Sequence, residues 1–370
     1  MEDLLKSLKD PAGRRSFLKR GLAAAGTASV GAGLLANGIS VFGRDRAKGS
    51  GSGLSSGDAA VLRFVAAAEL IESDLWVQYA ELGGVTSGAQ NPYQLALQRL
   101  DGDGSQYISS NTLDELSHGR FLDAYLASKG AEPVNLDQFR TLPSSQARGA
   151  KQIGRLTNLM QLTVDTSWYT RYRSSTNPEF GATFAQALPN LSSGVFTAIP
   201  RNDADFGPAN HIQAIANTAA FHFGSIEQGG SSLYPTLGQK VSDVEVLKIM
   251  FSIGGDEVAH FLEWVDFSGN GVQPPVAPFA DPTNGLEFPN FDAKPDRLRQ
   301  TNLIFPVPCE FISPDLPPCA VIRPTAAGFI DAMGAVNALT ASGLFIGQTD
   351  EFHDVLVNLA TAADNAQRQL

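Results

Sequence analysis

Two short motifs in the chain place a histidine three residues after a glutamate, and a lone glutamate precedes each motif at a distance. In an α-helix this spacing puts the glutamate and the histidine on one face, so both side chains can reach the same metal ion. Carboxylates can bridge two cations and each imidazole supplies one nitrogen, a set that suits iron or manganese better than magnesium or calcium. The candidate ligands are Glu69, Glu115, His118, Glu227, Glu257 and His260.

Four stretches with the apolar periodicity of helices carry these residues. The expected helices span residues 58–82, 111–128, 209–237 and 243–267. In the first, apolar side chains recur at steps of three and four and Glu69 lies on the same stripe, so its carboxylate faces a core. Asn111 is a good N-cap for the second helix, and Ser242 and Glu245 have the spacing of a capping box for the fourth. The sequence therefore predicts an all-α fold.

The longest connection, residues 129–205, separates the second of these helices from the third. It contains one expected helix, 145–173, followed by an irregular stretch with three prolines. A long crossover of this kind is expected where two helical pairs of a bundle are joined. Counting the parts along the chain, we expect an N-terminal signal and spacer over 1–57, a helical bundle over 58–268 and an extension over 269–370.

The C-terminal extension differs in composition from the bundle. Twelve of the 21 prolines fall between Pro274 and Pro324, which forbids long helices there and indicates an irregular wrap or a linker. Two final stretches, about 325–344 and 350–369, are Ala-rich and amphipathic. They either dock on the bundle or join copies of the chain into a homo-oligomer.

Each lone glutamate is followed seven residues later by an aromatic residue that can donate a hydrogen bond. Trp76 follows Glu69 and Tyr234 follows Glu227, two helical turns along the same face. Together with the Glu-x-x-His motifs, this offset resembles the ferritin-like superfamily, and specifically its exported ferritin-like domain proteins, some of them labelled desiccation-related. Residues 226–234 are similar to that group's third-helix motif, and the resemblance covers about residues 58–268.

The resemblance implies a ferritin-like four-helix bundle that holds two iron ions or two manganese ions. By that resemblance Glu115 and Glu257 bridge the metals, Glu69 and Glu227 are terminal ligands, and His118 and His260 supply one nitrogen each. Trp76 stands where the family usually has Tyr, so indole N–H donation is implied there but no phenol chemistry. At the corresponding position after Glu227, Tyr234 is the residue that the family usually has.

Other polar residues compete for roles at this site. Glu72 lies on the same helical stripe as Glu69, but the aromatic offset favours Glu69 as the ligand and leaves Glu72 beside it. Asp165 also has an aromatic residue seven positions on, although no Glu-x-x-His motif follows it. His222 and His211 are expected to cap, pack or support the ligands rather than to bind metal.

Two glycine pairs adjoin the candidate ligands, Gly229-Gly230 after Glu227 and Gly254-Gly255 before Glu257. A glycine inside a helix costs on the order of 1 kcal/mol. The pairs therefore indicate a close helix approach or a local bulge at the site, unless they mark helix breaks.

The N-terminus has the pattern of an export signal. Arg14 and Arg15 begin a match to the twin-arginine core, and an uncharged Ala- and Gly-rich run follows over residues 21–38. We expect the twin-arginine export machinery to deliver the chain to the periplasm or cell envelope. In that oxidising compartment Cys309 and Cys319 favour a disulfide over two free thiols.

The charge of the chain excludes some partners. Beyond residue 50 it has 18 Lys and Arg against 34 Asp and Glu, a net charge of −16. Such a chain is a poor ligand for nucleic acid or an anionic membrane, and it attracts cations.

Two functions fit these observations. The first is a redox enzyme in which the metal pair meets O₂ or peroxide, as a ferroxidase, a peroxidase or a manganese catalase-like protein. The second is a stress-related or desiccation-related envelope protein in which the metal only stabilises the bundle. A 24-subunit storage cage is disfavoured because the extension beyond residue 268 is long.

Overall fold

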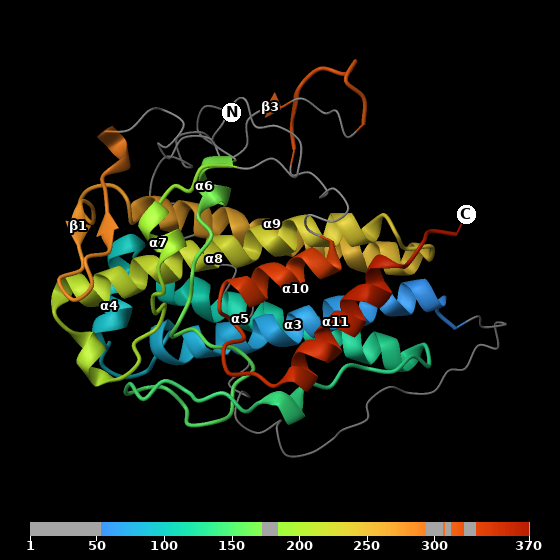
Figure 1. Ribbon diagram of the computed structural model, residues 1–370, viewed down its shortest axis with the longest axis horizontal. Coiled ribbons are helices and arrows are strands. Elements are labelled where there is room, and N and C mark those ends of the chain that lie inside the picture. Colours follow the sequence, from blue (N-terminus) through green and yellow to red (C-terminus); the bar gives the residue numbers. More distant parts are fainter. Residues whose placement is uncertain (1–52, 172–183, 294–305, 308–311, 322–330, 370) are drawn as a thin grey trace, which may run out of the picture. The chain divides into compact units, whose positions relative to one another are not determined.

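Four long helices form the centre of the fold and carry all six candidate ligands. The computed structural model describes residues 53–171, 184–293, 306–307, 312–321 and 331–369 (Figure 1). The four helices are α3 (Ser56–Gly83), α5 (Gly104–Ser128), α8 (Ala209–Gly238) and α9 (Val244–Asn270). Helix α3 packs chiefly against α5, and α8 packs chiefly against α9. The described chain is mostly helical, as the periodicity predicts.

The ends of α3 and α9 are joined by one buried carboxylate. The Ser55 hydroxyl accepts the Asp58 N–H at 3.0 Å and so caps α3. Asp58 in turn accepts the backbone N–H of Ser242 at 2.8 Å, just before α9 begins. The expected capping box at Ser242 is wrong by one residue, because the Asp243 side chain accepts the Glu245 N–H and is the N-cap. This contact fixes where α9 starts relative to α3.

Helix α5 begins earlier than its sequence indicates. It starts at Gly104, so Asn111 is not an N-cap but lies two turns inside the helix and is buried. Its amide has side-chain partners on other helices and does not need to cap its own. A further helix, α4 (Pro92–Leu100), was not expected and packs against α8. It begins with a capping box between Asn91 and Gln94.

The crossover between α5 and α8 is largely irregular, and the helix expected over 145–173 is wrong. Its regular elements in the described residues are short: the 3₁₀ turn η1 (Asp137–Phe139), α6 (Ser167–Arg171), α7 (Pro189–Ser193) and the 3₁₀ turn η2 (Asp203–Phe206). The backbone of this segment is held instead by distant partners. Leu156 and Thr157 donate their N–H groups to Asp74 of α3, and Leu162 exchanges hydrogen bonds with Phe196. The segment does not form the expected helix, because its backbone groups bond to these distant partners instead of to one another.

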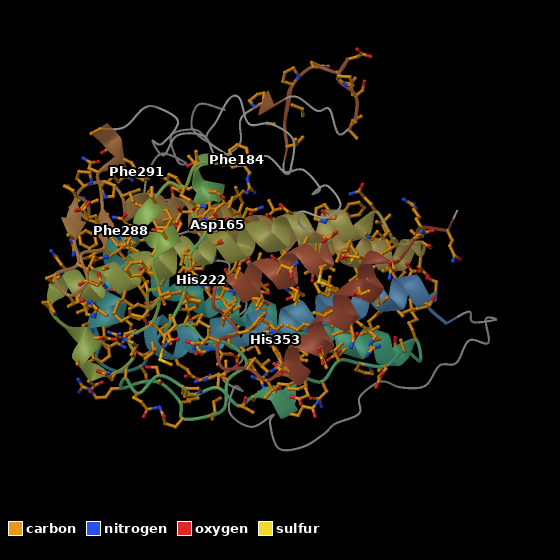
Figure 2. All side chains as sticks on the ribbon, in the orientation of Figure 1. Asp165, Phe184, His222, Phe288, Phe291 and His353 are labelled. Atoms are coloured by element: carbon orange, nitrogen blue, oxygen red, sulfur yellow. The ribbon has the colours of Figure 1, made fainter. Side chains whose placement is uncertain are left out.

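The segment after α9 forms two small hairpins and two helices. Its elements are β1 (Phe279–Ala280), β2 (Glu287–Phe288), the 3₁₀ turn η3 (Phe291–Ala293), β3 (Pro306–Val307), β4 (Cys319–Ala320), α10 (Ala332–Ala341) and α11 (Asp350–Asp364). Strand β1 pairs antiparallel with β2, and β3 with β4. The buried rings of Phe288 and Phe291 anchor the first hairpin (Figure 2).

The two C-terminal helices dock on the central helices. Helix α11 packs on α3, and α10 packs on α11 and α8. Both end earlier than expected, since α10 ends at Ala341 rather than near residue 344 and α11 ends at Asp364 rather than near residue 369. Residues 325–330, where the first of these helices was expected to begin, lie outside the described residues. The described residues beyond Ser52 belong to one compact unit. Within the described ranges, no helix has both the length and the apolar character that a membrane span requires.

Candidate metal centre

The six candidate ligands come together between the four long helices. Glu115, Glu227 and Glu257 have no exposed surface, and the other three are buried. Helix α3 contributes Glu69, α5 contributes the first motif, α8 contributes Glu227 and α9 contributes the second motif. Residues up to 191 positions apart therefore meet in one site, at the positions that the helical spacing predicts. A buried group of carboxylates and imidazoles of this kind can hold a metal ion.

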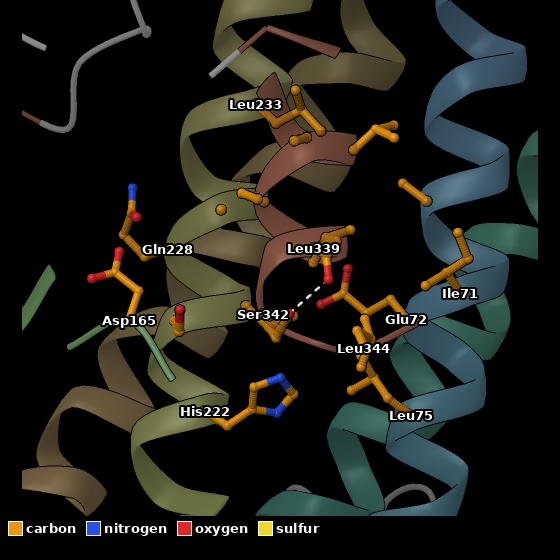
Figure 3. A pocket seen from close by; sticks show the side chains of 18 of the residues that line it. Ile71, Glu72, Leu75, Asp165, His222, Gln228, Leu233, Leu339, Ser342 and Leu344 are labelled. Carbon is orange, nitrogen blue, oxygen red and sulfur yellow. Dashed lines mark hydrogen bonds between the residues drawn. The ribbon is translucent and has the colours of Figure 1, made fainter. Parts of the chain in front are cut away.

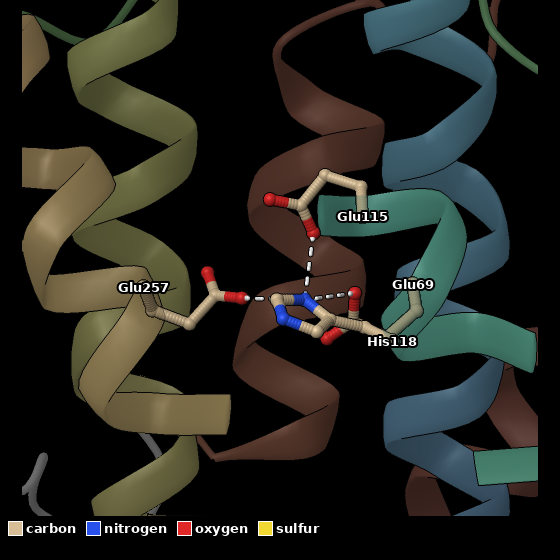
Figure 4. A group of neighbouring side chains, drawn as sticks. All are labelled: Glu69, Glu115, His118 and Glu257. Atoms are coloured by element: carbon tan, nitrogen blue, oxygen red, sulfur yellow. Dashed lines mark hydrogen bonds and ion pairs between the residues drawn. The ribbon is translucent and has the colours of Figure 1, made fainter. Parts of the chain in front are cut away.

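The donor atoms form overlapping groups with shared carboxylates. Within one group all donor atoms lie within 4.8 Å of one another. Three of the groups are Glu69, Glu115, His118 and Glu257; Glu115, Glu227 and His260; and Glu72, Glu227 and Glu257. A fourth group joins His260 to Asp114 and Asp256 at the edge of the cluster. Glu115 belongs to two groups that hold different histidines, and Glu257 also belongs to two. Figure 4 shows the carboxylates of the first group arranged around the His118 ring. Shared carboxylates are the feature that two neighbouring cations require.

Each imidazole turns its Nδ1 atom toward the carboxylates. The His118 Nδ1 atom lies 3.2 Å from Glu115 Oε2 and 3.4 Å from Glu69 Oε2. The His260 Nδ1 atom lies 3.0 Å from Glu115 Oε1 and 3.3 Å from Glu227 Oε2. The two halves of the site are thus built alike, with the two oxygens of Glu115 facing different imidazoles.

Two aspartates that the sequence reasoning missed hold the far sides of these rings. The His118 Nε2 atom lies 3.1 Å from Asp256, and the His260 Nε2 atom lies 3.4 Å from Asp114. Each aspartate directly precedes the glutamate of one motif and contacts the histidine of the other. The signal was in the sequence, because both motifs read Asp-Glu-x-x-His. A carboxylate on Nε2 fixes the ring orientation and leaves Nδ1 free to bind a metal.

Asn111, expected as a helix cap, is part of the site. Its amide nitrogen donates to Glu115 Oε1 at 3.0 Å and to Glu227 Oε1 at 3.2 Å. Its amide oxygen accepts the indole N–H of Trp264 at 2.9 Å, which fixes which way the amide faces. The amide therefore positions one oxygen of each carboxylate.

The aromatic residues at plus seven donate across the bundle rather than along their own helices. Trp76 of α3 donates its indole N–H to Glu227 of α8 at 3.1 Å, and Tyr234 of α8 donates its hydroxyl to Glu69 of α3. Seven residues span about 10 Å of helix, too far for either ring to reach the glutamate on its own helix. The offset therefore pairs two facing helices, because each aromatic residue donates to the lone glutamate of the other helix.

One glycine of each pair lets the helices approach at the site. A side chain at Gly230 would overlap the Glu257 carboxylate, and a Cβ at Gly254 would lie 2.7 Å from Tyr234 Cβ. Gly229 and Gly255 have open space where a Cβ would lie. Helices α8 and α9 run on through all four positions, so the pairs mark close approach and not helix breaks.

The remaining candidates lie beside the cluster or outside it. Glu72 shares a donor group with Glu227 and Glu257, so it joins Glu69 at the site instead of replacing it. His222 is hydrogen-bonded to the Tyr79 hydroxyl through Nδ1 and is in none of the donor groups found among the described residues. His211 lies between Asp205 and Asp281, apart from the cluster. The exposed side chain of Asp165 accepts hydrogen bonds from Ser167 and Gln186 and is also outside the donor groups found among the described residues.

The N-terminal and cysteine predictions fall largely outside the described residues. Arg14, Arg15 and Cys309 lie outside them, and Cys319 is exposed. The export signal and the disulfide therefore stay predictions.

The pKa values of several glutamates and histidines at the site are raised, because many buried carboxylates lie close together with little positive charge beside them. Burial raises the pKa of Glu115 to about 8, against the lowering effect of its hydrogen bonds to His118 and His260. Burial, together with the neighbouring carboxylates, raises the pKa of Glu257 well above its ordinary value. The carboxylates of Asp256 and Glu115 raise the pKa of His118 to about 12 although burial opposes this. The cluster thus holds more negative charge than its histidines neutralise.

Several oxygens at the site have no hydrogen-bond donor in the described structure. They are Oε2 of Glu69, Oε2 of Glu227 and both carboxylate oxygens of Glu257. Leaving a buried polar atom without a partner costs about 1–3 kcal/mol, more for a charged group. A cation between these oxygens would satisfy all of them, so the donor set fits a metal.

Comparison of the chain with protein-family models, curated proteins and solved structures gave no match.

Proposed function

We propose that the protein is a ferritin-like di-metal protein that binds two iron ions or two manganese ions and uses them in Fe(II) oxidation or in O₂ or peroxide chemistry. The observation that carries the proposal is that Glu115 and Glu257 each belong to two donor groups. Carboxylate oxygens of Glu69, Glu227 and Glu257 in these groups have no hydrogen-bond partner in the described structure. Glutamate carboxylates with two imidazoles suit iron or manganese, because all-oxygen sites suit magnesium or calcium and the donor groups contain no thiolate.

The proposed ligand assignment follows the two halves of the site. Glu69 and His118 would hold one metal, Glu227 and His260 the other, with Glu115 and Glu257 between them. When bound, such a pair supplies one-electron oxidation and reduction at each metal.

The protein's own groups keep the ligands ready for binding. Asp256 is hydrogen-bonded to Nε2 of His118, and Asp114 lies 3.4 Å from Nε2 of His260, so that each Nδ1 faces the cluster. Tyr234 and Trp76 each hold one oxygen of a terminal glutamate and leave the other oxygen for a metal. The buried rings of Trp76 and Trp264 stack with their centroids 5.2 Å apart. These contacts support a preorganised set of ligands, which favours redox chemistry over simple ion storage.

Metal analysis tests the proposal. The purified full-length protein, loaded anaerobically with Fe(II) or Mn(II), is expected to bind two ions per chain and then to consume O₂ or H₂O₂. Glu115→Ala with Glu257→Ala should abolish both properties. Glu132→Ala with Glu287→Ala is the matched control, since both side chains are exposed and lie outside every donor group. Fewer than one ion per chain in the wild type would refute the proposal.

A structural role for the metal remains the competing proposal. The docking of α10 and α11 on the central helices favours it, because an extension of this size adds stability without chemistry. Two bound ions that raise the unfolding temperature, with no consumption of O₂ or H₂O₂, would decide for this role.

A further inference from the structure

A cavity of about 180 Å³ adjoins the proposed metal centre. Helices α3 and α8 form its inner walls, and Glu69, Glu72 and Tyr234 stand at the side that faces the metal ligands. The C-terminal segment forms the outer wall with Val336, Leu339 and other apolar side chains (Figure 3). Exposed Asp165 also lines it, so the cavity reaches the surface beside the crossover.

His222 provides a hydrogen-bond donor inside this cavity. Its side chain is buried, it lines the cavity, and its Nε2 atom has no partner in the described structure. The Nδ1 atom lies 2.7 Å from the Tyr79 hydroxyl. If Tyr79 donates to Nδ1, the Nε2–H is the one group of this pair left without a partner; the other tautomer would also leave the tyrosine proton unbonded. Oε2 of Glu69 and Oε1 of Glu72, which also line the cavity, are acceptors without a partner in the described structure. Burial lowers the pKa of His222 to about 3, so the ring is neutral at pH 7.

The walls define the chemical class of the ligand. Most lining residues are apolar, and neither Lys nor Arg is among them, so an anionic ligand would have no counter-charge. A cavity of about 150 Å³ accommodates a benzene-sized molecule. A space of about 180 Å³ therefore suits roughly six to ten non-hydrogen atoms. The unpartnered Nε2–H requires an acceptor oxygen on that ligand.

We propose that this cavity binds a small, uncharged, mostly apolar organic molecule whose hydroxyl or carbonyl oxygen accepts the Nε2–H of His222, and that it holds this molecule beside the metal ligands. The position beside the metals rests on the proposed function, whereas the binding itself does not. The C-terminal helices would then complete a substrate site as its outer wall.

Calorimetric titration of the full-length protein tests the binding. The probes are phenol and toluene, which have the same number of non-hydrogen atoms, and benzoate as the anionic probe. Phenol should bind about tenfold more tightly than toluene, because one net hydrogen bond is worth about that factor. Benzoate should not bind. An absence of phenol binding to the wild type would overturn the proposal.

A glycine in the cavity wall provides the first variant. Gly229 lines the cavity and has open space where a Cβ would lie, so we expect the longer side chain of Gly229→Leu to extend into the cavity and occupy it. This variant should lose phenol and toluene binding and yet be at least as stable as the wild type, because a glycine is removed from a helix interior. The matched control is Gly255→Leu on α9, which is exposed and outside the cavity and should bind phenol normally. Unchanged phenol binding in Gly229→Leu would contradict the proposal.

A double variant isolates the hydrogen bond. Tyr79→Phe with His222→Phe removes both partners at once, which avoids leaving the tyrosine hydroxyl unbonded. It should bind toluene as the wild type does and lose the tenfold advantage of phenol. A retained advantage would exclude His222 as the donor.

Metal loading separates this proposal from the function on which part of it rests. In protein loaded with Mn(II), bound phenol lies beside a paramagnetic ion, so its proton resonances should broaden well beyond those in the metal-free protein. Two bound ions without phenol binding would refute the cavity proposal alone. Phenol binding without bound metal would refute the proposed function and the position beside the metals, and it would support the binding site itself.

Discussion

Two of the buried carboxylates of helix α3, Glu69 and Asp74, lie five residues apart and are held in opposite ways. Asp74 accepts the N–H groups of Leu156 and Thr157, each at 3.0 Å, and the guanidinium of Arg140 at 2.7 Å. Glu69 accepts the Tyr234 hydroxyl at one oxygen, and its other oxygen has no hydrogen-bond donor. Both side chains are almost fully buried.

The difference separates a structural carboxylate from a ligand. A buried carboxylate is stable when its oxygens are bonded within the protein, as those of Asp74 are. The carboxylates around Glu115 face one another, and several of their oxygens have no hydrogen-bond donor. This arrangement favours a bound cation or a bound proton. The crossover region should therefore be indifferent to metal, whereas the centre should depend on it.

Metal addition should give the largest contrast. With Mn(II) at 100 times the dissociation constant, two sites together should add about 5 kcal/mol to the free energy of unfolding. Glu115→Ala with Glu257→Ala should gain nothing from the same addition. Urea unfolding with and without Mn(II) measures both values, and an equal gain in the variant would show that the metal binds elsewhere.

Removing the ion pair between Arg155 of the crossover and Glu81 of α3 should lower the free energy of unfolding by slightly less than metal addition raises it. The loss should be the same with and without metal. Arg155→Ala leaves Glu81 without the guanidinium that lies 2.5 Å away, at a cost of about 3–5 kcal/mol. The matched control is Arg148→Ala, whose exposed pair with Asp203 should contribute less than about 1 kcal/mol. Urea unfolding in EDTA and in Mn(II) should give the same loss for Arg155→Ala. A loss that changes with metal would mean that the two regions are linked.

Removing one carboxyl group from each region should affect the metal-free protein to different extents. Glu257→Gln should change the free energy of unfolding by less than about 1 kcal/mol, because burial and the neighbouring carboxylates raise the pKa of Glu257 and one neutral group replaces another. Asp74→Asn should lower the free energy of unfolding by about 1–3 kcal/mol, since the Asn amide would present donors to two N–H groups. Thermal unfolding in EDTA compares the two variants, and equal losses would refute the distinction.

The pH dependence should also differ between the metal-free and metal-loaded protein. The folded-state pKa of Glu115 is raised to about 8, so its contribution to stability is present below its ordinary value of 4.5 and is lost as the pH rises toward 8. His118, with its pKa raised to about 12, acts in the same direction above pH 6.5. Each group contributes at most about 1.4 kcal/mol per pH unit.

Bound metal should reverse this slope, because the ligands must lose protons to bind it. Urea unfolding between pH 5 and 8, with EDTA and with Mn(II), should give profiles of opposite slope. Parallel profiles would contradict the assignment of these carboxylates as ligands.

The sequence by itself determined the four long helices and the side chains that meet between them. Both depend on local rules, since the three- and four-residue steps fix which face of a helix carries Glu69 or Glu257. The same rules failed over residues 145–166, where the backbone bonds to Asp74 and to other distant partners instead of forming a helix.

Only the tertiary structure decided which groups hold those ligands. Trp76 donates to a glutamate 151 residues away, Asn111 lies in the site instead of capping a helix, and each aspartate contacts the histidine of the other motif. The cavity likewise depends on where α10 docks. Spacing along the chain cannot specify such contacts, because they depend on how helices far apart in the sequence face one another in space.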